Sequence, residues 1–206
     1  MHWYPVPMSP RLLDALERAG VFSLYGWLVW RIASGAGLEF GKFQLVSEGM
    51  IVLFLLVRRP AKAISVRPMD WVLALVATTA PLLVTGGLGE GHLPTRLVTV
   101  LWLLGFVVQV GAKLWLGRNF GLVAARREVV LGGPYRFVRH PMYFGYLLTH
   151  LAVLGMNPTP TNFACYAVSW LVQVPRLLAE ERVLAEEASY AAYQRSVRWR
   201  LIPGLW

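Results

Sequence analysis

The sequence predicts an all-α fold: a polytopic transmembrane helix bundle of about six spans, with both termini cytoplasmic. Three observations support this prediction. The 206 residues are 56% hydrophobic and 15% charged, with a mean hydropathy of +0.51, whereas about a quarter of the residues of a soluble domain are charged. Long apolar segments alternate with short polar turns. Lysine and arginine fall mainly at one end of these segments.

The expected spans follow the apolar segments in order. An amphipathic lead-in at residues 11–18 precedes a short first span. Residues 1–10 contain no long apolar run, so a cleaved signal peptide is not expected. The six spans are expected at residues 20–33, 43–57, 69–85, 95–116, 141–156 and 163–178. Residues 117–139 form a polar connection, and residues 179–206 form a polar tail. We therefore expect N-terminal transmembrane helices over 1–116 and a connection, a helix hairpin and a tail over 117–206, within one integrated domain.

The basic residues indicate the orientation of the bundle. With the N-terminus in the cytoplasm, all but three of the 20 lysines and arginines lie on the cytoplasmic side, the exceptions being Arg31, Lys42 and Arg96. This asymmetry obeys the positive-inside rule. The net charge of +9 is then explained by basic loops that face an anionic leaflet, and nucleic acid is not an expected partner. The single cysteine, Cys165, allows no internal disulfide.

A cationic and aromatic segment, which we call the knot, precedes the fifth span. It covers residues 133–145 and reads Gly-Pro-Tyr-Arg-Phe-Val-Arg-His-Pro-Met-Tyr-Phe-Gly. Pro141 suits the first position of a helix, where its missing N–H costs nothing. Arg139 and His140 would then lie at the helix mouth, where free N–H groups can hold an anionic or polar ligand. The same spacing is also compatible with an ordinary basic loop.

The last two spans are joined by a tight turn, so we expect them to form an antiparallel hairpin. This hairpin would bring the knot, at its start, close to the tail at its end. Arg176 and Glu180 are four residues apart and share one helix face. The expected pocket has Arg139, His140 and Tyr143 on one wall and Arg176, Glu180 and Glu181 on the other.

Four motifs in this order resemble the isoprenylcysteine carboxyl methyltransferase family. They are the knot, Arg176 followed by Glu180-Glu181-Arg182-Val183-Leu184, Tyr190-Ala-Ala-Tyr193, and Leu201-Ile202-Pro203. Phospholipid methyltransferases share the Arg-His-Pro and paired-glutamate elements. The resemblance covers roughly residues 116–203. It implies a cytoplasmic pocket for S-adenosyl-L-methionine, with S-adenosyl-L-homocysteine as product. It also implies a lipophilic methyl acceptor that enters from the surrounding membrane lipids, and a multi-pass protein of a prokaryotic cytoplasmic membrane.

The resemblance assigns a role to each matching residue. The implied cofactor-binding residues are Glu128, Val129, Val130, Tyr135, Arg139, His140, Pro141, Met142, Tyr143 and Glu180. The run from Arg127 to Val130 stands where the family more usually has a His-Thr-Leu-Val type of run. Arg176 matches an arginine at the methyl acceptor. A carboxylate acceptor needs no general base, but an amine or thiol acceptor does, and Glu181 or His140 is then the candidate.

Each of these residues also has a simpler interpretation. His140 could cap a helix, Glu180 and Glu181 could face solvent, and Arg176 could snorkel to the membrane edge. Tyr190 and Tyr193 suit interfacial packing. The four histidines lack metal-ligand spacing, so no metal is expected, and no phosphate loop or dinucleotide fingerprint is present.

Several functions are therefore compatible with the sequence. The leading hypothesis is carboxyl O-methylation of an isoprenylcysteine-like substrate. Alternatives are N-methylation of a phospholipid amine or S-methylation of a small thiol. A NADPH-dependent membrane reductase, or a non-enzymatic scaffold or transporter, represents another class. The sequence gives no indication of the oligomeric state.

Overall fold

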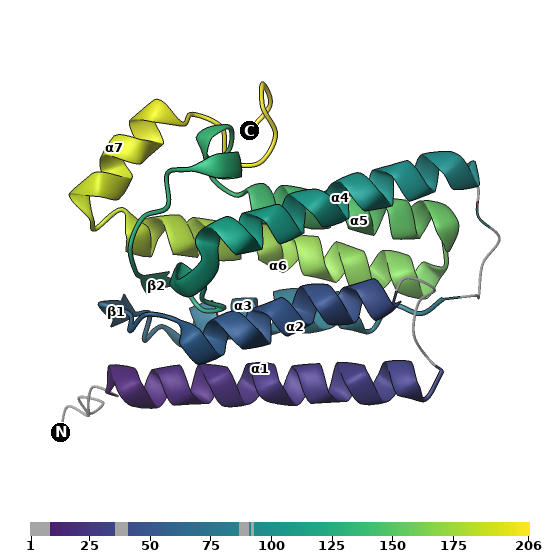
Figure 1. The fold of residues 1–206 in the computed structure, drawn as a ribbon, viewed down its shortest axis with the longest axis horizontal. Coiled ribbons are helices and arrows are strands. Elements are labelled where there is room, and N and C mark those ends of the chain that lie inside the picture. The colour runs from purple at the N-terminus through teal and green to yellow at the C-terminus, as the bar shows by residue number, and fades with distance from the viewer. Residues whose placement is uncertain (1–8, 36–40, 87–90, 92) are drawn as a thin grey trace.

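A computed structural model describes residues 9–35, 41–86, 91 and 93–206. Within these residues the chain folds mainly into seven α-helices (Figure 1). They are α1 (Pro10–Ala33), α2 (Gly41–Val57), α3 (Pro68–Leu82), α4 (Thr95–Leu116), α5 (Pro141–Met156), α6 (Pro160–Leu184) and α7 (Ala188–Ser196). Two short 3-10 helices, η1 (Gly117–Asn119) and η2 (Gly133–Arg136), lie between α4 and α5. The prediction of a helical fold is confirmed.

Two of the described helices, α1 and α6, begin with a side-chain cap. Ser9 caps α1 by accepting the N–H of Leu12 at 3.2 Å, and Thr159 caps α6 by accepting the N–H of Asn162 at 3.2 Å. Such side chains satisfy N–H groups that have no partner inside the helix. In both cases a proline follows as the first helical residue, where its fixed φ suits the helix.

The structure differs from the expected elements in three places. The amphipathic lead-in and the first span form one continuous helix, α1. The tail contains α7, which was not predicted. Two short strands, β1 (Ala63–Ile64) and β2 (Ala125–Arg126), pair antiparallel and tie the loop after α2 to the connection after α4. The connection between the first two expected spans falls largely outside the described residues, and the connection between the third and fourth falls partly outside them.

The packing of the last two long helices also differs from the expected hairpin. The helices α5 and α6 touch at few points: α5 packs along α4, and α6 packs along α3. Glycines explain the α4–α5 contact, because a Cβ at Gly145 would lie 2.6 Å from the Gln109 nitrogen and 2.7 Å from the Gly105 oxygen. Small residues let helix backbones approach closely in this way. The ends of α5 and α6 nevertheless converge, as expected.

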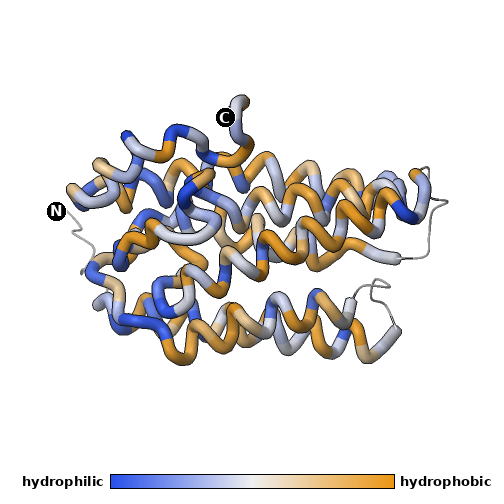
Figure 2. The backbone as a smooth tube through the Cα atoms, turned by 45° about the horizontal axis from the view of Figure 1, so that its top comes forward, coloured by the Kyte–Doolittle hydropathy of each residue, from blue (hydrophilic) through white to orange (hydrophobic). Residues whose placement is uncertain are grey.

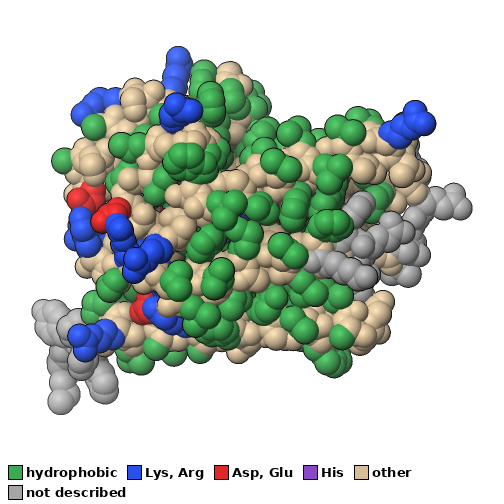
Figure 3. Space-filling model, viewed as in Figure 1, with side chains coloured by type: hydrophobic (Ala, Val, Ile, Leu, Met, Phe, Trp, Pro, Cys, Tyr) green, Lys and Arg blue, Asp and Glu red, His purple; other side chains and the backbone are tan. Residues whose placement is uncertain are grey.

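Polar residues collect at one end of the bundle. Figure 2 shows apolar stretches along the long helices and hydrophilic stretches at the end that carries α7. In the space-filling view most basic side chains gather at this same end, while apolar side chains cover the flanks of the helices (Figure 3). On these flanks Trp30, Leu53, Val107 and Leu171 are each more than half exposed.

One described helix, covering Thr95–Asn119, is long and apolar enough to cross a membrane by length and composition. The helices α2 and α3 are apolar but shorter. A single such helix is weak support for membrane insertion, and the exposed apolar flanks point in the same direction.

Candidate functional site

A cavity opens at the polar end of the bundle, between the α4–α5 connection, the start of α5, the end of α6 and α7. Counted with its open mouth it encloses about 770 Å³. Its walls are formed by Leu116, Asn119, Gly121, Val123, Ala125, Arg127, Glu128, Val129, Val130, Tyr135, Arg139, His140, Met142, Tyr143, Glu180, Leu184, Tyr190 and Tyr193. We call it the polar-end cavity.

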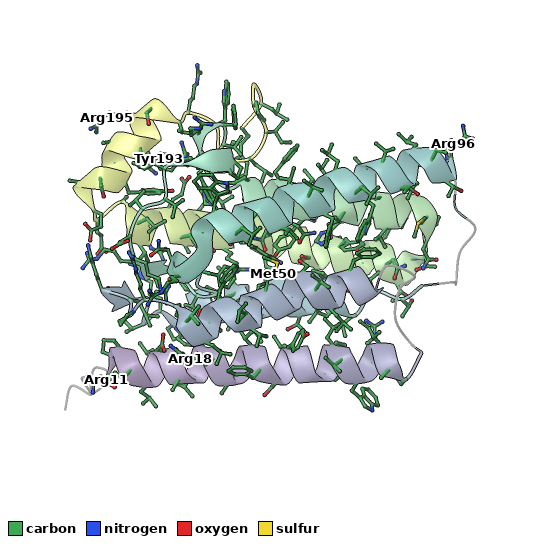
Figure 4. The ribbon with its side chains drawn as sticks, in the orientation of Figure 1. Arg11, Arg18, Met50, Arg96, Tyr193 and Arg195 are labelled. Atoms are coloured by element: carbon green, nitrogen blue, oxygen red, sulfur yellow. The ribbon has the colours of Figure 1, made fainter. Side chains whose placement is uncertain are left out.

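The beginning of the knot is held by a glycine turn against α4. Gly133 has a φ of 57°, a conformation that favours glycine. A Cβ there would also collide with the ring of Trp115. The turn leads directly into Tyr135, whose hydroxyl donates to the Ala112 carbonyl at 3.4 Å. From α7, the hydroxyl of Tyr193 donates to the Tyr135 carbonyl at 2.7 Å, so the tail fixes this segment as well (Figure 4).

A carboxylate joins the knot to the tail. Glu181, which is 5% exposed, accepts Arg139 Nε at 2.7 Å and Arg200 Nε at 3.0 Å, and lies 3.2 Å from His140 Nε2. Burial by itself raises the pKa of Glu181, but hydrogen bonds from His140, Arg139 and Arg200 outweigh it and lower the pKa to about 2. An ionised carboxylate with these partners is a poor proton acceptor.

The backbone of the knot is fixed to the same tail. Arg139 donates its N–H to the Trp199 carbonyl at 2.9 Å, and His140 donates its N–H to the Arg200 carbonyl at 2.8 Å. The Arg139 side chain also donates Nη1 to the carbonyls of Val197 and Arg198 at 2.9 and 3.0 Å. We call residues 197–200 with Glu181 and Arg139 the tail clamp. Together these contacts favour a positioning role for Glu181 over the role of general base for which it was one candidate if the acceptor is an amine or a thiol.

Glu180, one residue earlier on α6, faces the cavity. It accepts a hydrogen bond from the Tyr143 hydroxyl. Arg176 forms an ion pair with the same carboxylate, with Nε 3.4 Å from Oε1. The guanidinium carbon of Arg176 lies 5.5 Å from the centre of the Tyr143 ring, a cation–π distance, and its Nη2 donates to the Leu122 carbonyl at 2.8 Å. These three side chains form a partition at the inner end of the polar-end cavity.

A second cavity, which we call the bundle cavity, lies between the long helices on the other side of this partition. It encloses about 950 Å³ when counted with its opening, and its walls come from α2, α3, α4, α5, α6 and the loop after α4. Arg176 and Met142 both line it, and Met142 also lines the polar-end cavity. This space explains why α5 and α6 touch at few points.

The bundle cavity combines aromatic and polar side chains. Tyr146, His150, Tyr166 and Trp170 form a contiguous aromatic wall, with centroids of the His150 and Tyr166 rings 4.3 Å apart. Glu48 is also in the lining. The remaining polar lining residues include Gln44, Ser47, Gln109, Thr149, Ser169 and Gln173.

The structure therefore brings together most of the residues singled out by sequence. Nine line the polar-end cavity: Glu128, Val129, Val130, Tyr135, Arg139, His140, Met142, Tyr143 and Glu180. Pro141 begins α5 beside them without lining the cavity, Arg176 lines the bundle cavity, and Glu181 lies behind the wall in the tail clamp. Sequence reasoning missed Arg127, Gly121 and Arg200. It expected Tyr190 and Tyr193 to serve in packing; both are buried in the core, and both also line the cavity. Among the described residues no cluster of His, Cys, Asp or Glu could hold a metal ion.

These features describe a helical protein with one cavity at the polar end of its bundle and a second cavity among its long helices. Residues 93–191, which run from just before α4 into α7, match the phospholipid methyltransferase family. The predicted family relationship is thus confirmed. Members of this family are methyltransferases of lipid-related substrates and generally use S-adenosylmethionine. No curated protein matches the chain.

Proposed function

We propose that the protein is an integral-membrane methyltransferase that binds S-adenosyl-L-methionine in the polar-end cavity and a lipophilic acceptor in the bundle cavity. One observation carries the proposal: the two cavities adjoin at Met142, with Tyr143, Glu180 and Arg176 between them. Donor and acceptor would therefore meet at this partition. The polar cavity opens at the charged end, whereas the other lies among apolar helices.

The residues of the polar-end cavity fit the methyl donor. When bound, S-adenosyl-L-methionine supplies an electrophilic methyl group on a sulfonium cation. Aromatic faces such as those of Tyr135, Tyr143 and Tyr190 favour a cation of this kind. Glu180 can bind an ammonium or ribose hydroxyls through charge-assisted hydrogen bonds. Methyl transfer is an in-line displacement, so fixing both partners in line supplies much of the acceleration.

Arg176 suits the orientation of a carboxylate acceptor. Its guanidinium is fixed by Glu180, by the Leu122 carbonyl and by the Tyr143 ring, and guanidinium groups match carboxylates in geometry. A carboxylate is already ionised at neutral pH and loses no proton on methylation. Such a reaction needs no general base, which agrees with the engagement of the Glu181 carboxylate by three hydrogen-bond donors. We therefore propose carboxyl O-methylation of an isoprenylcysteine-like lipid as the reaction.

N-methylation of a phospholipid amine is the second candidate. It is supported by the aromatic wall of the bundle cavity and by Glu48 in the same lining, because aromatic rings and a carboxylate together favour an ammonium group. The name of the matching family agrees with this candidate. Glu48 is, however, already paired with Lys113 Nζ at 3.2 Å, which leaves less of its charge for a substrate.

The proposed topology places α1–α6 across the cytoplasmic membrane, with the polar-end cavity in the cytoplasm. Two observations support this topology: basic residues gather at the polar end, and apolar side chains cover the flanks of the helices (Figure 3). In this arrangement residues 117–206 supply most of the site, and residues 1–116 supply most of the bundle around it.

Titration of the detergent-purified protein tests the function. S-adenosyl-L-homocysteine is expected to bind, NADPH is not, and Glu180→Ala is expected to abolish the first signal. Binding of NADPH alone would support a membrane reductase, and binding of neither would support a scaffold or transporter. Incorporation of a radiolabelled methyl group from the donor into membrane extracts then separates the acceptors. Label released as methanol by mild alkali identifies a methyl ester, whereas N-methyl label resists alkali.

A further inference from the structure

Arg127 is a buried arginine in the wall of the polar-end cavity. It follows β2 directly and is 4% exposed. Among the described residues its guanidinium makes no hydrogen bond or ion pair, and its Nε and Nη2 are buried without a partner. Its neighbour Arg126 instead points to the surface, where it pairs with Glu186 at 3.0 Å and Glu187 at 3.4 Å.

The described residues around Arg127 leave space for its guanidinium but provide no carboxylate that pairs with it. The group lies against Gly121, where a side-chain carbon would collide with it. Burial lowers the pKa of Arg127, and the negative charge of Glu17 opposes this effect. The Glu17 carboxylate is already used, because it accepts the N–H groups of Leu122 and Val123 and pairs with Arg58 at 2.9 Å.

An unpaired buried cation is costly for a folded protein. Arginine donors in such a position are well suited to receive an anionic group that enters the cavity. The other arginine of this cavity, Arg139, is held by Glu181 and two carbonyl groups of the tail. Arg127 is therefore the cavity arginine with unused donors in the described part of the chain.

We propose that Arg127 binds the α-carboxylate of the methyl donor. This inference rests on the proposed function and refines it. The amino-acid end of the donor is a zwitterion, and the cavity offers it a carboxylate, Glu180, and a guanidinium, Arg127.

Calorimetric titration with two nucleosides tests the proposal on the full-length protein in detergent. S-adenosyl-L-homocysteine carries the carboxylate, whereas 5′-methylthioadenosine has the same adenosine and sulfur but no amino-acid end. Arg127→Gln is expected to weaken binding of S-adenosyl-L-homocysteine on the order of 10- to 100-fold, as for loss of a hydrogen bond to a charged group. The affinity for 5′-methylthioadenosine should stay unchanged. Arg127→Lys should retain part of the affinity. The control Arg126→Gln should alter neither.

Thermal unfolding without ligand separates a binding role from a structural one. Since Arg127 has no partner in the described structure, Arg127→Gln should leave the unliganded protein at least as stable as the wild type. A large fall in its thermal midpoint, or equal loss of both nucleosides, would overturn the proposal, as would unchanged binding of S-adenosyl-L-homocysteine. Selective loss of NADPH binding in this variant would instead assign Arg127 to a phosphate. A wild-type protein that binds neither nucleoside would contradict the proposed function itself.

Discussion

At the residue scale, adjacent glutamates on α6 have different surroundings. Glu180 faces the polar-end cavity and holds Tyr143 and Arg176, whereas Glu181 is buried in the tail clamp. Consecutive residues on a helix point about 100° apart, so one can face a ligand while the next binds the tail. The pair Glu-Glu is thus better understood as one cavity residue followed by one positioning residue.

Arg176→Lys should separate acceptor chemistry from donor binding. A lysine keeps the charge but loses the planar fork, so kcat/KM for the acceptor should fall by about 100-fold, as for a misplaced reactant. The dissociation constant of S-adenosyl-L-homocysteine should change little. Steady-state kinetics and titration check both values. Arg182→Lys, at a partly exposed arginine that pairs with Asp70 at 2.6 Å, serves as control and should leave kcat/KM unaltered.

Glu181 should make stability depend on pH in the acidic range. Its pKa is lowered from 4.5 to about 2 in the folded state, so its stabilisation is complete above the unfolded pKa and is lost as the pH falls towards 2. The difference in thermal midpoint between wild type and Glu181→Gln should therefore be large at pH 6 and smaller at pH 3. Glu186→Gln, at the surface, should show no such change. Equal differences at both pH values for Glu181→Gln would refute this account.

Sequence reasoning found the residues of contiguous motifs and missed residues that act across the fold. The knot and the Glu180 region were recognisable because their residues are close in the chain. No short sequence pattern marks Arg127 or Arg200. The role of Arg127 depends on its donors remaining unpaired in the fold. The role of Arg200 depends on a contact with Glu181 that only the folded tail creates.

At the element scale, the tail clamp orders the knot from a distance in sequence. Two backbone hydrogen bonds and the Glu181 carboxylate join residues 197–200 to Arg139 and His140. The helix α7 is short and rich in small and polar residues, and so it lacks the apolar length by which the other helices were predicted. The pairing of β1 with β2 spans two residues per strand, too few for a periodic pattern.

Arg200→Gln should weaken the donor site without unfolding the protein. The variant removes one of three donors to Glu181, and Arg200 is partly exposed. We expect the affinity for S-adenosyl-L-homocysteine to fall a few-fold, roughly the effect of one partly exposed ion pair. Titration measures the change. Arg195→Gln, on α7 (Figure 4), should bind the ligand like the wild type, and an equal loss in both variants would argue against the clamp.

The α4–α5 contact offers a matched pair of glycine substitutions. Gly145→Ala inserts a methyl group 2.6 Å from the Gln109 nitrogen, and such overpacking should destabilise the protein by about 1–3 kcal/mol. Gly111→Ala, on α4, meets no atom within 4 Å and should stabilise by roughly 0.5–1 kcal/mol. Thermal unfolding in detergent compares them. Similar midpoints for the two variants would contradict the close approach of these helices.

At the scale of the whole molecule, the two ends of the bundle differ in charge. Arg195 and Arg96 mark opposite ends in Figure 4. If the helices cross the membrane as proposed, the end with Arg195 faces the cytoplasm and the end with Arg96 faces outward. The sequence predicted this asymmetry from charge counts alone, because the rule concerns loops and not their detailed structure.

Cysteine labelling tests the orientation. In a Cys165→Ser background, Arg195→Cys should react with a membrane-impermeant maleimide in inverted vesicles, and Arg96→Cys should react in intact cells. Both thiols should react after detergent solubilisation, which controls for accessibility. The reverse pattern would place the polar-end cavity on the outer side, and labelling of both positions from one side would contradict a spanning bundle.

The partition of Tyr143, Glu180 and Arg176 has a consequence for turnover. In the proposed function, a water-soluble donor and a lipophilic acceptor on opposite faces of this partition would arrive from different phases, and each would depart by its own route. Neither ligand then obstructs the other, so kinetics should follow a random sequential scheme without compulsory order. S-adenosyl-L-homocysteine should compete with the donor and act as a noncompetitive inhibitor toward the lipid.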